Sequence, residues 1–139
     1  MNIGDAAEGS GVSAKMIRYY EETGLIPKPA RSDSGYRNYR LTDVHTLRFI
    51  RRSRDLGFSI ERIRELLKLW QDRSRSSHEV KEIALAHVAA LDADIAKLTG
   101  LRDAVRHLAG QCHGDEHPEC PILDELGGDG AHRLQRHIQ

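Results

Sequence analysis

The stretch "IGDAAEGSGVSAKMIRYYEETG", residues 3–24, contains two short helical patterns separated by a turn. The first pattern stops at Gly11, where the turn "GVS" begins. Ser13 can cap a second helix, because its side-chain oxygen can accept a hydrogen bond from a free backbone N–H of the first turn. Gly24 is suited to end that helix. Two short helices in this order predict a helix-turn-helix unit.

The second of these helices has two different faces. Ile17 and Tyr20 lie three positions apart and are expected to point inward, whereas Lys15, Arg18 and Tyr19 share another face. Cationic side chains beside an aromatic ring suit a groove lined with phosphates. The alternative is a solvated helix face with a packed tyrosine. We interpret the face as a surface for recognising DNA.

Residues 25–41, "LIPKPARSDSGYRNYRL", are expected to form a small hairpin, or wing. The two prolines break any helix, and "SDSG" is typical of a turn. The segment "YRNYRL" alternates as a strand does. Such a wing would present Arg31, Tyr36, Arg37 and Arg40.

Two further helices are predicted after the wing. Thr42 is expected to cap the first, over 43–56, and Ser59 the second, over 60–70. Each has an apolar stripe at helical spacing. The residues expected to face the core are Val44, Leu47, Ile50, Ile60, Ile63, Leu66, Leu67 and Trp70.

A long helix is predicted over about 77–109. Its aliphatic residues recur every three or four positions, which is typical of a coiled-coil seam. At about 1.5 Å per residue such a helix runs roughly 50 Å, more than the rest of this short chain could cover. We therefore expect a homodimer paired along the seam, although the helix could instead pack back on its own domain. The seam residues are Val88, Leu91, Ile95, Leu98, Leu101, Val105 and Leu108.

The two halves of the chain differ in charge. Residues 1–75 hold 15 Lys/Arg and 10 Asp/Glu, whereas residues 76–139 hold 6 and 11. A basic half joined to an acidic half indicates nucleic acid binding at one end. The N-terminus has no apolar signal segment, and no stretch nears the roughly 18 apolar residues of a membrane span. We expect a cytoplasmic protein, in which thiols stay mostly reduced.

The stretch "QCHGDEHPECP", residues 111–121, holds both cysteines, Cys112 and Cys120, together with His113 and His117. A pair of thiolates favours a soft ion such as Cu(I), Ag(I) or Au(I), whereas zinc generally takes four ligands. A redox enzyme is disfavoured, because catalytic dithiols are usually spaced C-x-x-C. An architectural DNA-binding dimer with the loop as a structural clip is a further alternative.

Together these segments resemble the MerR-type transcription regulators. The resemblance rests on "IGDAA", the "GVS" turn, "IRYYE", "GLI" and "SGYRNY" in order over residues 2–39, and the later helices extend it over nearly the whole chain. It implies a mainly α fold. The implied parts are a winged helix-turn-helix DNA-binding domain over 1–75, an antiparallel dimerisation helix over 76–110, a metal-binding loop and short helix over 111–126, and a flexible tail over 127–139.

The resemblance also implies partners and contacts. A homodimer would bind promoter DNA and, on binding its effector, distort the DNA so that RNA polymerase can use the promoter. The residues placed on DNA by motif position are Lys15, Arg18 and Tyr19 on the recognition helix and Arg31, Tyr36 and Arg37 in the wing.

The loop "CHGDEHPEC", followed by "PI", most resembles that of the copper-efflux regulators, the CueR/HmrR type. Relatives that respond to divalent ions take a third thiolate from the start of the partner's dimer helix, where this chain has Ser77. The resemblance therefore implies Cu(I), or Ag(I) or Au(I), as an effector bound by Cys112 and Cys120. The alternative is a divalent, zinc-type ion held by these cysteines with His113 and His117.

Overall fold

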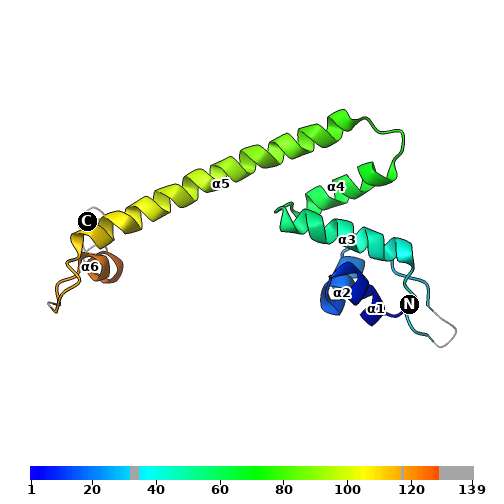
Figure 1. The fold of residues 1–139 in the computed structure, drawn as a ribbon, viewed down its shortest axis with the longest axis horizontal. Helices are drawn as coiled ribbons and strands as arrows, with labels where there is room; N and C mark the ends of the chain where they lie inside the picture. Colours follow the sequence, from blue (N-terminus) through cyan, green and yellow to red (C-terminus); the bar gives the residue numbers. More distant parts are fainter. Residues whose placement is uncertain (32–34, 117, 129–139) are drawn as a thin grey trace, which may run out of the picture. The chain divides into compact units, whose positions relative to one another are not determined.

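The computed structural model describes residues 1–31, 35–116 and 118–128, and within these ranges the chain is helical. Both the mainly α fold and the predicted order of helices are confirmed (Figure 1). Two compact units can be distinguished, Met1–His87 and Val88–Gln139. The predicted loose tail lies outside the described residues from 129 onward. The helices are α1 (Ile3–Ser10), α2 (Ala14–Glu22), α3 (Leu41–Asp55), α4 (Ile60–Gln71), α5 (Ser77–Gln111) and α6 (Pro121–Gly127).

The helix-turn-helix begins with a capping box between Asn2 and Asp5, which was not predicted. The Asp5 amide donates to the Asn2 side chain at 2.8 Å, and the Asn2 amide donates back to the Asp5 carboxylate at 3.3 Å. Ser13 caps α2 as predicted, accepting from the Met16 amide at 3.2 Å. Gly11 ends α1 at φ 76°, a backbone angle that favours glycine.

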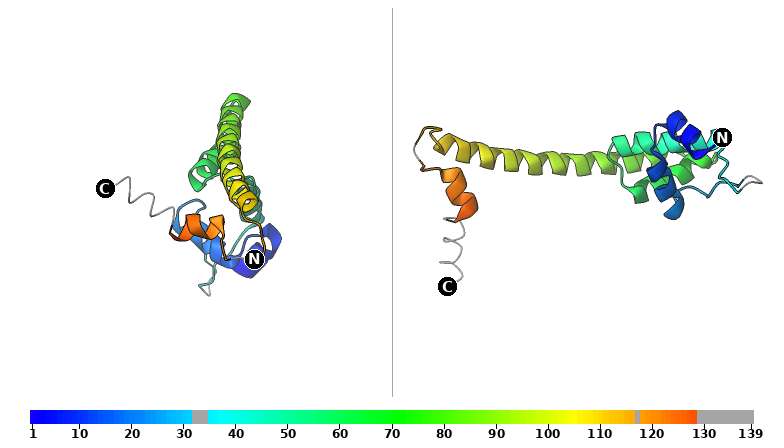
Figure 2. Two further views of the ribbon diagram at one scale, coloured as in Figure 1. Left: turned by 90° about the vertical axis from the view of Figure 1, so that its left-hand side faces the viewer. Right: turned by 90° about the horizontal axis from the view of Figure 1, so that it is seen from below.

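The core of the first unit is mainly aliphatic, with Tyr20 and Tyr39 also buried, and lies among four helices. Helix α1 packs on α2 and α3, and α3 packs on α4 (Figure 2). Full burial of an aliphatic side chain of this size contributes about 1.5–3 kcal/mol, so a few such residues hold the unit together. The most deeply buried large side chains are Ile17, Val44, Leu47, Ile50 and Ile63.

Two details of the second helix pair differ from prediction. Thr42 is inside α3 and does not cap it, because the Arg40 amide at the N-cap position donates to Asp43 at 2.8 Å. Trp70 is 43% exposed and not a core residue. It lies in the last turn of α4, beyond the buried Leu67, where its ring stacks on Phe49 at a centroid distance of 4.5 Å.

The wing also differs from prediction. Its described residues form no strand, but a single antiparallel bridge between Arg31 and Arg37. Pro27 and Pro29 lack backbone N–H groups, which limits the ladder on the first arm. The second arm is fixed at its end, where the Tyr39 amide donates to the Met1 carbonyl at 2.7 Å.

Helix α5 begins in the first unit and continues into the second. His87 fixes its first turns: the imidazole stacks on Phe58 at 4.1 Å, and Nε2–H donates to the Leu56 carbonyl at 2.6 Å. The helix continues through Gly110, where it was predicted to stop. None of the described helices combines the length and apolar character needed to cross a membrane.

In the second unit a loop connects α5 to the short helix α6. Ile122 is half-buried, whereas Leu123 is 67% exposed. A helix of under two turns offers one side to its neighbour, and Leu123 falls on the other.

Candidate DNA interface and metal site

Helix α2 has the two faces that its sequence predicts. Ile17 and Tyr20 are buried, whereas Lys15, Arg18 and Tyr19 are exposed. The Tyr19 ring leans against Tyr20 with centroids 5.9 Å apart. Burial raises the pKa of Tyr20 above its usual range. The structure thus places the three residues predicted to contact DNA together on one accessible face of α2.

The wing residues have different surroundings. Arg31 Nη1 donates to the Gly35 carbonyl at 3.0 Å, and Gly35 has φ 85°. Tyr36 is largely exposed and Arg37 is half-buried. Arg31 and Arg37 are therefore already engaged by the protein before any DNA arrives.

A buried carboxylate, missed in the sequence, ties the wing to α2. Glu21 is only 4% exposed. Its Oε2 pairs with Arg37 Nε at 3.2 Å, and its Oε1 accepts from the Tyr39 hydroxyl at 2.5 Å. Burial, and then the bond to Glu21, raise the pKa of Tyr39 well above its usual range. Glu21 follows Ile17 by four positions, and this helical spacing was the signal that it lies on the buried face.

The two cysteines meet at the ends of their loop. Cys112 directly follows α5 and Cys120 occupies the N-cap position of α6, so each helix end positions one thiol. Their sulfur atoms are 3.6 Å apart, within a hydrogen bond in which either thiol can donate. Both side chains are half-buried and neither is in a disulfide. Two sulfurs this close can be ligands of one ion.

The surroundings of Cys120 favour its thiolate. The backbone N–H of Leu123 lowers the pKa of Cys120 most, followed by the Cys112 thiol, while burial and then the charge of Asp124 oppose them. Cys120 forms no side-chain cap hydrogen bond at the start of α6. Since metals bind the thiolate, this environment suits a ligand.

The remaining candidate ligands are not gathered at the sulfurs. His113 is exposed, and His117 lies outside the described residues. Within the described ranges no three side chains of His, Cys, Asp or Glu approach closely enough to hold an ion. Ser77 is the exposed first residue of α5, in the other unit from Cys112 and Cys120.

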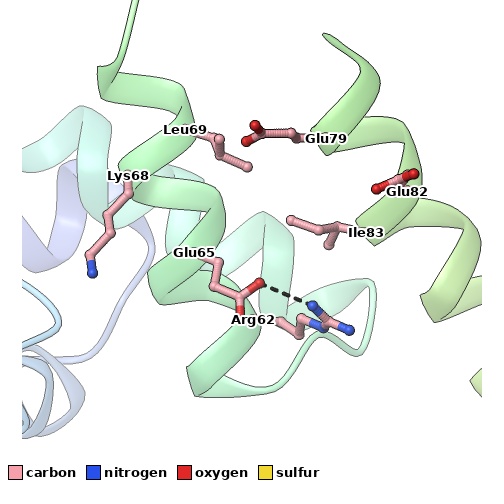
Figure 3. A pocket seen from close by; sticks show the side chains of 7 residues that line it. All are labelled: Arg62, Glu65, Lys68, Leu69, Glu79, Glu82 and Ile83. Carbon is pink, nitrogen blue, oxygen red and sulfur yellow. Dashed lines mark hydrogen bonds and ion pairs between the residues drawn. The ribbon is translucent and has the colours of Figure 1, made fainter. Parts of the chain in front are cut away.

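A pocket of about 490 Å³ between α4 and the first turns of α5 offers no ligands for a soft metal ion. Acidic and basic side chains line it around Leu69 and Ile83, and Arg62 pairs with Glu65 at 3.0 Å (Figure 3). Cysteine and histidine are absent from its lining residues. The thiol pair is therefore the better candidate for a metal site.

The predicted seam of α5 is exposed. Six of its residues, from Val88 to Val105, have between 41% and 63% of their surface accessible, and Leu108 is half-buried. A continuous apolar row of this length on a surface marks an interaction site.

A helix-turn-helix with an exposed basic face, followed by a long helix with an apolar seam, defines a DNA-binding protein of the helix-turn-helix class. Residues 1–70 match the family model of the MerR HTH family regulatory proteins, and residues 44–108 match the model described as MerR, DNA binding. The chain belongs to the MerR family of transcription regulators. The family is one of regulators, and the protein is not an enzyme.

Individual relatives agree with this assignment. The chain is 56% identical over 131 residues to heavy metal-dependent transcription regulator 2 of Rhizobium meliloti (strain 1021), covering 94% of this chain and 89% of that protein. It is 40% identical over 136 residues to CueR of Salmonella typhimurium, covering 98% and 99%. The lead(II) complex of PbrR691 from Ralstonia metallidurans CH34 is similar in structure, with a TM-score of 0.78, 31% identity, and coverage of 91% and 99%.

Proposed function

We propose that the protein is a transcription activator that binds promoter DNA as a homodimer and responds to Cu(I), or to Ag(I) or Au(I), bound by Cys112 and Cys120. The heavy-metal dependence in the name of the R. meliloti relative supports the general class. The observation that supports the particular effector is the pair of thiols 3.6 Å apart, with no third ligand near them among the described residues.

The number and type of ligands favour a monovalent soft ion. Thiolates select soft ions, and zinc sites are almost always four-coordinate with nitrogen, oxygen or sulfur ligands. Two sulfurs suffice for a d¹⁰ monovalent ion. When bound, such an ion would bridge the end of α5 to the start of α6 and hold the loop between them in one conformation.

The DNA-binding part of the proposal rests on the exposed face of α2 and on the wing. Lys15 and Arg18 can donate to phosphates or to base edges, and Tyr19 adds an apolar contact. Arg37, oriented by Glu21, can donate its remaining N–H groups to a phosphate. A dimer of such domains would bind a nearly palindromic site.

The exposed apolar seam of α5 supports the proposed homodimer. A second copy of α5 is the partner that offers the same apolar row over the same length, in the way coiled-coil helices bury each other. The ion would then alter the angle between two DNA-binding domains, and transcription would respond through the shape of the promoter.

The second candidate is a divalent-ion sensor. It is favoured by the likeness to PbrR691, whose structure contains lead(II). In this chain such a site would need His113 and His117 or a ligand from a partner chain. Ser77 offers a weaker ligand than a thiolate at the start of α5.

In-vitro transcription from the protein's own promoter separates these candidates. We expect activation by Cu(I), Ag(I) and Au(I), and little by Zn(II), Pb(II) or Hg(II). Cys112→Ser and Cys120→Ser should each abolish the response while promoter binding is retained. His113→Ala is the matched control from the same loop and should respond normally. The divalent sensor would be established instead if divalent ions activated transcription at least as strongly as Cu(I) and if His113→Ala lost this response.

A further inference from the structure

The two helices of the helix-turn-helix end without cations of their own. Neither α1 nor α2 has a basic residue in its last turn. The last carbonyl groups of any helix lack intrahelical partners and form the negative end of its dipole. A cation at such an end is therefore stabilising, and here it has to come from elsewhere in the fold.

Arg64 supplies that cation to α2. Its Nη1 donates to the Gly24 carbonyl at 3.0 Å, and its Nη2 donates to the Thr23 carbonyl at 3.1 Å. The two arms of one guanidinium thus bind the two successive carbonyls at which α2 ends. A planar fork fits such a pair, whereas a lysine ammonium is a point charge without this geometry.

Packing of α4 fixes the position of the fork. Arg64 is half-buried and follows Ile63, which is fully buried, and Leu67 one turn later is buried as well. Since α4 is anchored in the core by these side chains, the guanidinium holds the end of α2 against a rigid element.

Arginines of helix α3 bind the carbonyls at the end of α1 in the same way. Arg48 Nε donates to the Gly9 carbonyl at 2.8 Å, and Arg51 Nη1 donates to the Gly11 carbonyl at 2.6 Å. Gly11 is favoured there because its φ is 76°, a backbone angle that other residues rarely adopt. Both helices of the helix-turn-helix are thus capped by arginines of the second helix pair.

We infer that Arg64 is a positioning residue for DNA recognition: its fork sets the end of α2 and with it the orientation of the face formed by Lys15, Arg18 and Tyr19. The inference rests on the proposed DNA binding by that face. Arg64 itself does not contact DNA, although it contributes to the basic charge of the N-terminal half. The opposite assignment, a phosphate contact, makes a different prediction for salt dependence.

The test compares Arg64→Lys and Arg64→Met with Arg62→Met. Arg62 lies on the same helix but points into the pocket beside α5, where it pairs with Glu65 (Figure 3). The dissociation constants of the full-length protein are measured, over a range of salt, for its own promoter and for an unrelated duplex. The salt slope is the slope of the logarithm of DNA affinity against the logarithm of salt concentration. Arg18→Ala removes a predicted DNA contact and calibrates this slope.

For both Arg64 variants we expect the preference for the promoter over the unrelated duplex to fall about tenfold, the size of one lost specific contact. The salt slope should stay that of the wild type, and Arg62→Met should change neither quantity. A slope reduced by about one, as expected for Arg18→Ala, would make Arg64 a phosphate contact and overturn the inference. An unchanged preference would overturn it as well.

Amide hydrogen exchange provides a readout without DNA. The Leu25 and Ile26 amides donate to the Tyr20 carbonyl at the end of α2, at 2.9 and 3.3 Å. Arg64→Met should speed their exchange while the Gly11 amide, bonded to Ala7, is unchanged. Equal acceleration at Gly11 would indicate general destabilisation and overturn the positioning role. If the wild type binds no promoter fragment, the proposed function fails, and exchange alone decides whether Arg64 caps α2.

Discussion

The predicted DNA contacts are not equivalent at the scale of single residues. Lys15, Arg18 and Tyr19 are exposed on one helix face, whereas Arg31 and Arg37 already bond to the protein. An arginine held in place loses less conformational entropy when it binds DNA than a freely rotating one. In the proposed DNA complex, the wing arginines would therefore lose little conformational entropy.

Glu21→Gln tests how far the carboxylate prepares Arg37. The amide can still bond to Tyr39, but the charge that holds Arg37 is lost. We expect the free energy of unfolding to fall by about 1–3 kcal/mol, the range for removing one partner of a buried hydrogen bond, and promoter affinity to fall with it. Urea unfolding and DNA titration measure the two effects.

The neighbouring Glu22 is exposed, so Glu22→Gln is the matched control and should leave stability unchanged. Equal losses from both variants would mean that the buried position of Glu21 is irrelevant.

The substitution Ser77→Cys tests which residues set the metal selectivity. A cysteine at this position would offer a third thiolate at the start of α5, and a higher ligand number suits divalent ions. Ser77→Cys should therefore gain activation by Zn(II) or Hg(II) in the transcription assay. The adjacent variant Ser76→Cys controls for a thiol added nearby. Identical metal responses of the two variants would remove Ser77 from the proposed site.

At the scale of elements, helix boundaries follow local chemistry and helix faces follow periodicity. Ser13 and Ser59 cap α2 and α4 as predicted. The start of α3 was misplaced because Asp43, and not Thr42, accepts from the first free amide. Helix α5 is the element whose apolar face remains exposed in one chain, and this exposure predicts its partner.

Leu98→Asp tests the seam of α5. Leu98 is exposed in one chain and would be buried twice in a symmetric dimer. Losing two buried leucines costs about 3–6 kcal/mol, so we expect dimer dissociation to be favoured about a hundredfold or more. Sedimentation equilibrium measures the constant. Lys97→Asp introduces the same carboxylate one position away and should leave the dimer intact. A monomeric wild type would show that the seam is not a dimer interface.

At the scale of the whole molecule, charge and function divide along the chain. The basic excess lies in residues 1–75 and the acidic excess in 76–139. Part of the basic excess also serves the fold, since Arg48, Arg51 and Arg64 donate to backbone carbonyls. The DNA face and the thiol pair belong to different compact units.

Removal of the ion should therefore separate two activities. A chelator of Cu(I) added to the activated complex should return transcription to its basal level, because the loop between α5 and α6 loses its bridge. Promoter affinity should change far less than transcription, since the DNA face of α2 lies in the other unit. Cys112→Ser is the control and should respond to neither copper nor chelator. Release of the DNA on chelation would argue for metal-dependent binding instead.

Much of the fold and part of the site could be predicted from local patterns. The spacing of aliphatic residues, with the caps at Ser13 and Ser59, predicted the helices and their order, whereas the cap at Thr42 and the stop at Gly110 were wrong. The wing was harder, because its expected strand needs a ladder that two prolines limit. Trp70 was misjudged because a stripe shows which side of a helix is apolar and not where the core ends.

The sequence by itself determined the helix-turn-helix, the long helix and the presence of two thiols in one loop, since each depends on residues close together in the chain. The tertiary structure alone decided which polar groups meet. Glu21 bonds to Arg37 and Tyr39, and Arg64 bonds to Thr23 and Gly24, although these partners lie 16 to 41 residues apart in the sequence. Such contacts depend on how whole helices pack, and a helical period contains no information about the partner that a neighbouring helix will bring.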